Sequence, residues 1–126
     1  MKKPSKLHVS AGFRDFVLDQ LAGMRDLRPQ PMFGGIGLYS GDIFFGIIAA
    51  DVLYFKIDDT TRPDYEAGGS HLFAPFPGRP TTMGYYSVPT SILEDPEALA
   101  KWASRAVRVA GGSTRAGKRR RKGGKR

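Results

Sequence analysis

Cysteine is absent from this chain of 126 residues, and so is any apolar run long enough to cross a membrane. Without cysteine the protein can form neither a disulfide nor a zinc–thiolate site. A membrane-spanning helix needs about 18 or more consecutive, mostly apolar residues. The basic residues 1–13 also lack the apolar block of a secretory signal. These absences favour a cytoplasmic protein.

Histidine is nearly absent as well, since His8 and His71 are the only two. They do not show the HExxH spacing that is typical of a zinc enzyme. Ser70 precedes His71, but neighbours in a strand point to opposite faces, so the pair does not indicate a nucleophile and its base. We expect no metal and no cofactor.

Residues 111–126 contain eight basic residues and no acidic residue. The other twelve basic residues and all twelve acids lie in residues 1–110, so the net charge of +8 belongs to residues 111–126. Few apolar groups and like charge favour disorder. Such a segment can neutralise phosphates of nucleic acid without reading base sequence. The candidate nucleic-acid-binding residues are Arg115, Lys118, Arg119, Arg120, Arg121, Lys122, Lys125 and Arg126.

Three helices are indicated by apolar spacing and by capping residues. The first covers residues 10–24, with Ser10 as N-cap, and the second lies within residues 58–69. The third begins at Asp95-Pro96 and is expected to stop at Gly111-Gly112. We therefore predict three parts: a flexible N-terminus at residues 1–9, a domain at residues 10–110 and a disordered basic tail at residues 111–126.

Five β-rich runs lie between these helices. Residues 36–39, 43–49 and 52–57 are separated by hairpin-sized breaks and predict a three-stranded antiparallel meander. Residues 71–76 and 81–88 predict a second hairpin. In the third run Leu53, Phe55 and Ile57 alternate with Tyr54, Lys56 and Asp58, so that the second set is expected on a solvated face. Gly46 predicts a bulge or a close contact. The order is α-βββ-α-ββ-α, an α+β domain.

Three groups of residues could carry chemistry. The glycines at residues 34–37 are followed by a strand, whereas a phosphate loop needs a helix N-terminus, so we interpret them as shaping the sheet. Tyr85 and Tyr86 could stack on a base, but one core and one surface tyrosine is the ordinary alternative. Carboxylates around Arg62 could hold Mg²⁺ or act as acid and base, or they could simply cap a helix. They are Asp58, Asp59, Asp64 and Glu66.

Several segments together resemble the N-terminal domain of the TfoX/Sxy family. They are the MFGG start at residues 32–35, the LYFKID strand at residues 53–58 and YYSVP at residues 85–89, followed by a DPEAL-initiated helix with Trp102. The resemblance covers about residues 10–110. It implies an α+β domain. Full-length members are bacterial regulators of natural competence that act with the cyclic-AMP receptor protein, without a known enzymatic activity. They carry a second, helical domain, where this sequence has its basic tail, so we expect a standalone N-terminal domain.

The sequence thus favours a non-enzymatic regulatory adaptor. Its body would bind a protein partner, with the transcription machinery as a candidate, and its tail would contact nucleic acid. One alternative is an enzyme that acts on nucleic acid or a nucleotide, with the acidic and aromatic residues as its site and the tail as a tether. Another is a ligand- or protein-binding module whose tail is merely solubilising.

Overall fold

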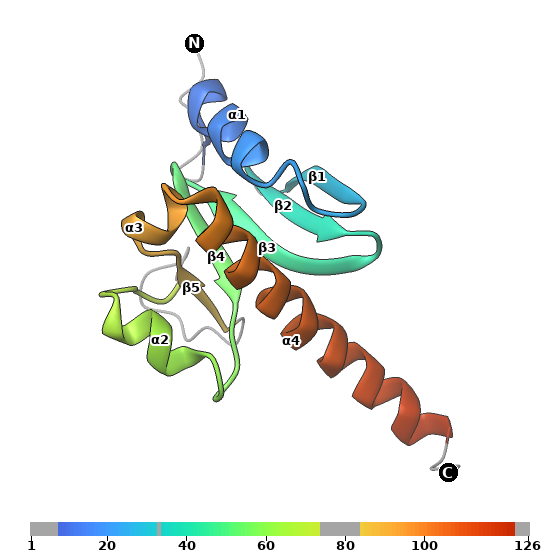
Figure 1. Ribbon diagram of the computed structural model, residues 1–126. Helices are drawn as coiled ribbons and strands as arrows, with labels where there is room; N and C mark the ends of the chain where they lie inside the picture. The colour runs from blue at the N-terminus through green and yellow to red at the C-terminus, as the bar shows by residue number, and fades with distance from the viewer. Residues whose placement is uncertain (1–7, 33, 74–83, 123–126) are drawn as a thin grey trace.

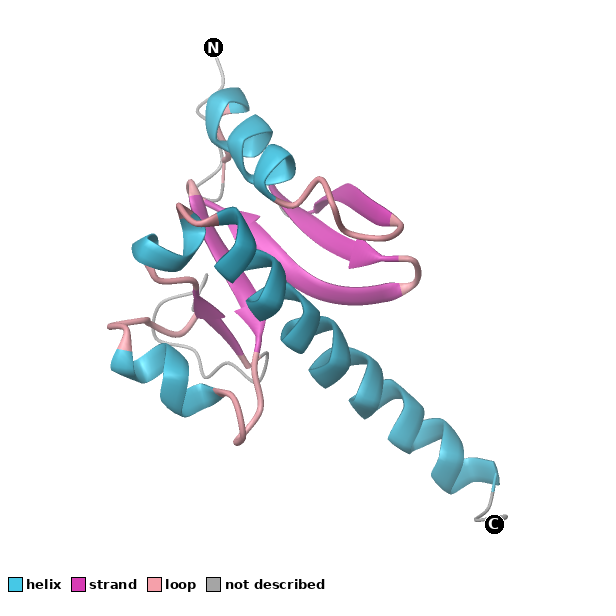
Figure 2. Ribbon diagram, in the orientation of Figure 1, coloured by secondary structure: helices cyan, strands magenta, loops and turns pink. Residues whose placement is uncertain are grey.

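The protein is a five-stranded antiparallel sheet with helices at the start, middle and end of the chain (Figures 1 and 2). The computed structural model describes residues 8–32, 34–73 and 84–122, with residues 113–122 by their backbone alone. The sheet order follows the chain order. The predicted α+β class is confirmed. The elements are α1 (Ala11–Gln20), β1 (Leu27–Met32), β2 (Gly35–Ser40), β3 (Ile43–Ala49), β4 (Val52–Lys56), α2 (Arg62–Ala67), β5 (Tyr85–Ser87), α3 (Thr90–Leu93) and α4 (Pro96–Lys122).

The helix starts are where the capping residues placed them. The Ser10 hydroxyl accepts a hydrogen bond from the Phe13 amide at 3.2 Å. The Asp95 carboxylate accepts from the amides of Glu97 and Ala98, at 3.1 and 3.2 Å. Each bond satisfies an amide that has no partner within its helix. Both predicted N-caps are therefore confirmed.

The last helix extends further than the sequence indicated. The Gly111-Gly112 pair, where we expected α4 to end, lies within its range. Two glycines cost a helix about 1 kcal/mol each relative to alanine, and the alanine, arginine and lysine residues around them are strong helix formers. In Figure 1 the C-terminal part of α4 extends away from the sheet. That residues 111–126 form a separate segment stays a prediction, and residues 123–126 lie outside the described residues.

The sheet contains the predicted meander, as β2, β3 and β4, and one strand that was not foreseen. The register between β2 and β3 shifts beside Gly46, which confirms the predicted irregularity. A Cβ atom at Gly46 would lie 3.1 Å from the Tyr54 carbonyl oxygen, so the close approach of β3 and β4 favours glycine at this position. The unforeseen strand is β1, which contains Pro29 and Pro31. Proline is tolerated there because β1 is an edge strand, which within the described residues pairs only with β2.

The second predicted hairpin is present in its described part. Leu72 pairs with Tyr86 in an antiparallel bridge. The Phe73 amide donates to the Tyr85 carbonyl at 2.8 Å, and the Ser87 amide donates to the His71 carbonyl at 2.9 Å. The connection through residues 74–83 lies outside the described residues. Within the described residues, no helix is long and apolar enough to cross a membrane.

The larger hydrophobic core lies between the sheet and helices α1 and α4, which cover the same face. Residues Val17 and Leu21 at α1 and its C-cap are at most 1% exposed, and so is Leu99 of α4. They pack with residues of β2, β3 and β4, so that α4 is fixed on the sheet along its first four turns. The buried residues of α4 that contribute are Leu99, Ala103, Ala106 and Ala110.

The opposite face of the sheet carries a second, aromatic core, and here the sequence prediction was wrong. Tyr54 was expected on a solvated face, but it is only 8% exposed. Its ring lies 4.7 Å from the ring of Phe73, and both belong to a cluster with Ile47 and Tyr85. Strand alternation predicted which side chains share a face. It did not show that residues 71–73 cover the second face.

Buried tyrosines make the protein sensitive to alkaline pH. Burial raises the pKa of Tyr65 and Tyr85, because an ionised phenol would lose its hydration. In the unfolded chain these groups ionise near pH 10. Keeping these phenols neutral therefore does not lower the free energy of unfolding below about pH 10. Above that pH the unfolded chain ionises first, and the free energy of unfolding falls as the pH rises toward the higher pKa of the folded state.

A Tyr65→Phe variant is expected to lose less stability at high pH than the native chain. Between pH 9 and pH 11 the fall in its free energy of unfolding should be smaller by about 1.4 kcal/mol, because one ionising group has been removed. Urea unfolding at both pH values measures the difference. At pH 9 the tyrosines are still neutral, so the difference in stability between the variant and the native chain at that pH measures lost packing alone. An equal fall in both proteins would contradict the role of burial.

Candidate functional site

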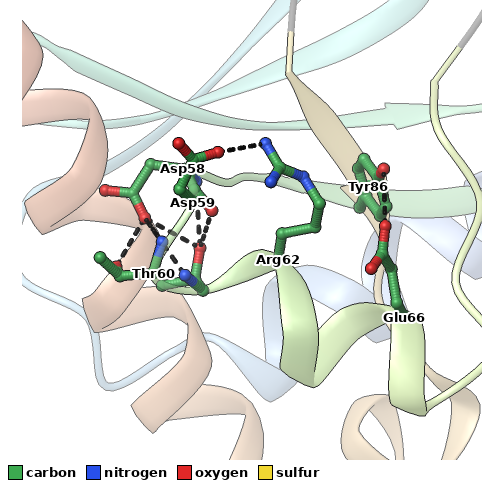
Figure 3. A network of polar contacts seen from close by, with 7 residues as sticks. Asp58, Asp59, Thr60, Arg62, Glu66 and Tyr86 are labelled. Carbon is green, nitrogen blue, oxygen red and sulfur yellow. Dashed lines mark hydrogen bonds and ion pairs between the residues drawn. The ribbon is translucent and has the colours of Figure 1, made fainter.

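The carboxylates near α2 are held by different partners, and Figure 3 shows those of Asp58, Asp59 and Glu66. One oxygen of Asp58 accepts hydrogen bonds from the Thr60 hydroxyl at 2.6 Å, from the amides of Thr60 and Thr61 at 2.9 and 3.2 Å, and from the Thr61 hydroxyl at 3.5 Å. These bonds, first that of the Thr60 hydroxyl, lower the pKa of Asp58. Asp59 pairs with Arg62 at 2.7 Å. Asp58 therefore organises the turn that leads into α2, whose N-cap position is Thr61.

Asp64 connects α2 to α4. Its carboxylate lies 2.8 Å from the Arg105 guanidinium, which also lies over the Trp102 ring at 5.3 Å. The Trp102 ring packs against the Tyr65 ring at a centroid distance of 4.5 Å. An ion pair and an aromatic contact thus hold the short helix α2 against the long helix α4. Trp102, Arg105, Asp64 and Tyr65 form one structural joint between the two helices.

Glu66 points to a different neighbour again. It accepts a hydrogen bond from the Tyr86 hydroxyl at 3.3 Å (Figure 3). The carboxylates therefore do not share a single centre, and among the described residues no group of three or more His, Asp or Glu could hold a metal ion. The arrangement gives no support to the enzymatic alternative, which rested on these side chains acting together.

The two adjacent tyrosines lie on opposite faces of the sheet, and the expected surface tyrosine, Tyr86, is half-buried against the larger core. Tyr85 is 4% exposed and belongs to the aromatic core behind the sheet. Tyr86 is half-buried on the helical face, where its ring lies 6.4 Å from that of Tyr65. Because the two rings lie on opposite faces of β5, they cannot together form a platform for a nucleic-acid base.

A hydrogen-bonded chain around His71 was missed by the sequence analysis. Its Nδ1 lies 3.2 Å from the Ser87 hydroxyl, and its Nε2 lies 3.4 Å from the Tyr54 hydroxyl. The His71 amide also donates to the Ser87 hydroxyl at 3.0 Å. These contacts join the segment at residues 71–73 to β4 and β5. No sequence signal marks them, because Ser87 and Tyr54 reach His71 only through strand pairing.

The glycine cluster at residues 34–37 shapes the sheet. Gly35 begins β2, and no helix follows the cluster that could present amides to a phosphate. A Cβ atom at Gly37 would lie 2.6 Å from the terminal methyl of Met32 on β1 and 3.1 Å from the Phe44 ring. Gly37 therefore leaves room for side chains of the neighbouring strands, which agrees with the interpretation that this cluster shapes the sheet.

The candidate nucleic-acid-binding residues form part of α4 or follow it. Six of the eight fall in the helical backbone of residues 113–122, and Lys125 and Arg126 lie outside the described residues. Closer to the sheet, α4 carries two further exposed cations, Lys101 and Arg108. Neither forms an ion pair with any residue that the structure describes. Cations that were treated as a separate tail thus share one helix with cations of the folded body.

Comparison with known proteins agrees with this architecture. No curated protein matches the chain. A family model described as the TfoX N-terminal domain matches residues 19–110, which include all five strands and the part of α4 that packs on the sheet. The match covers well over half of the chain and agrees with the resemblance seen in the sequence. The chain therefore belongs to the TfoX N-terminal domain family.

Proposed function

We propose that this protein is a cytoplasmic, non-enzymatic regulatory adaptor of the competence-regulator type. Its folded domain would bind a protein partner, with the transcription machinery as the first candidate, and its basic C-terminal segment would hold the complex on nucleic acid. Family membership supports the regulatory role. The absence of cysteine agrees with a reducing compartment.

The observation that carries the proposal is the separation of charge along the chain. Residues 1–110 contain equal numbers of acidic and basic residues, whereas residues 111–126 contain eight basic residues and no acid. Nothing in residues 111–126 can neutralise these cations internally. Phosphates of a nucleic acid would release counterions on contact with them, which drives binding without base recognition.

Salt dependence of DNA binding tests the proposal. If all eight cations contact a duplex, the logarithm of the association constant should fall with the logarithm of salt concentration at a slope of about −7, and at about −6 for a single strand. Fluorescence anisotropy with labelled duplexes of two unrelated sequences measures the slope. Similar affinity for both sequences is expected, because phosphate contacts carry no sequence information. A slope near zero would contradict the proposal.

A pull-down from bacterial lysate with and without nuclease tests the protein partner. A partner of the folded domain should stay bound after nuclease treatment, whereas proteins bridged by nucleic acid should be lost. If every captured protein is lost, the adaptor role of the domain fails and only the nucleic-acid contact remains.

A further inference from the structure

A cavity of about 430 Å³ lies between the end of α1 and the outer flank of α4. Gln20 and the following turn form one wall, and Ser104 and Arg108 of α4 form the other. Arg25 projects from the turn, which is held in place because the Ser40 hydroxyl donates to the Arg25 carbonyl at 3.0 Å. Two arginines from segments more than eighty residues apart therefore line one hollow.

The charge of this cavity is uncompensated. No carboxylate lines it, and within the described ranges Arg25 and Arg108 form no ion pair. Arg108 also lines the hollow on the other flank of α4. That hollow differs from the first cavity, since it contains the carboxylate of Asp58, and its Arg105 is already bound to Asp64. The backbone carbonyls at the end of α1 contribute only about half a negative charge. The cavity therefore favours an anion.

Part of the cavity wall is apolar, from Leu21, Met24, Ala100 and Val107, and the polar part of the lining suits a phosphate group. Guanidinium groups present parallel N–H donors that match two oxygens of one phosphate. The Ser104 hydroxyl in the same cavity can supply a further donor. The partly open position between two helices suits a group that is part of a larger molecule.

The continuation of α4 indicates what that larger molecule is. Basic residues recur on α4 at intervals of seven, which is two helical turns, so they occupy nearly the same side of the helix. Successive positions are about 10 Å apart, and the whole row extends about 32 Å, close to the 34 Å of one turn of B-DNA. The residues at these positions are Lys101, Arg108, Arg115 and Lys122.

We infer that the cavity formed by Arg25, Ser104 and Arg108 binds a backbone phosphate of duplex DNA, so that the folded domain itself is part of the DNA interface. The inference rests on the proposed function, because the basic segment brings the DNA to this flank of α4. The inference differs from the proposed function because it assigns a defined phosphate site to the folded domain. The tail would supply sequence-independent attraction, and the cavity would fix where the backbone lies.

The test compares full-length variants on a labelled 20-base-pair duplex of arbitrary sequence. Arg25→Gln with Arg108→Gln should reduce the steepness of the salt slope by about 1, because one phosphate contact is lost. The matched control is Arg14→Gln with Arg28→Gln, which removes the same charge from exposed arginines that pair with Asp15 and Asp42. The control should keep the native slope.

Three results would overturn the inference. The first is an equal change in the cavity variant and its control, which would mean that only net charge matters. The second is an unchanged slope in the cavity variant. The third is a cavity effect seen with a 20-base-pair RNA duplex and not with DNA. Neutralising residues 118–122, alone and together with the cavity changes, separates the two proposals. If the changes at residues 118–122 reduce the salt dependence and the cavity changes alter nothing, the inference fails while the proposed function stands.

Discussion

Replacing the five consecutive cations at residues 118–122 by glutamine is expected to reduce the affinity for duplex DNA on the order of 10³- to 10⁴-fold at about 0.1 M salt. Eight contacts predict a slope of about −7, and the three that remain predict about −3. Glutamine is a good helix former, so the substitutions remove charge without disfavouring the helical backbone of α4. The changes are Lys118→Gln, Arg119→Gln, Arg120→Gln, Arg121→Gln and Lys122→Gln.

The matched control conserves charge. Lys118→Arg with Lys122→Arg keeps all the cations and should retain the native slope, because arginine and lysine both neutralise phosphate. Anisotropy titrations between 50 and 400 mM salt measure both variants and the native chain. Native slope and affinity in the glutamine variant would contradict the role of the segment and would leave the merely solubilising tail as the better explanation.

Truncating Phe55 to alanine is expected to lower the free energy of unfolding by about 3–5 kcal/mol. Phe55 of β4 is fully buried, and its ring lies 5.8 Å from the ring of Phe45 on β3. It belongs to the core that fixes α1 and α4 on the sheet. The substitution removes a large apolar side chain and leaves a cavity that rigid neighbours on several elements cannot fill.

The control for this prediction is Phe16→Ala. Phe16 is 39% exposed on α1, and its loss should cost about 1 kcal/mol or less. Urea unfolding of both variants, followed by circular dichroism, gives the two free energies. If the two variants lose similar stability, Phe55 is not the centre of the core that its burial indicates.

The fold was predictable wherever neighbouring residues decide it. Hydrogen bonds and steric limits within a few positions decide the Ser10 and Asp95 caps, the hairpins of the meander and the role of the glycines at residues 34–37. Strand β1 was not foreseen, because Pro29 and Pro31 disfavour a strand locally and are tolerated only at an edge. Whether a strand lies at an edge depends on how the other strands pair, and residue spacing along the chain does not reveal that pairing.

The candidate site divides in the same way. The basic segment and its lack of acids were visible in the sequence, and so was the division of Tyr85 and Tyr86 between two faces. The separate partners of Asp58 and Asp64 were only partly foreseen, because a local cap can be recognised but an ion pair with Arg105 requires α2 and α4 to lie together.

By itself the sequence determined the family, the α+β order of elements and the separation of a charge-balanced domain from a cationic end, because composition and short-range pattern suffice for these. Only the tertiary structure decided that Tyr54 is buried, that α4 continues past Gly111-Gly112, and that Arg25 and Arg108 line one cavity. The reason is physical: burial and convergence depend on which distant segments pack against one another, and a side chain cannot be placed against a neighbour before the backbone that carries that neighbour is folded.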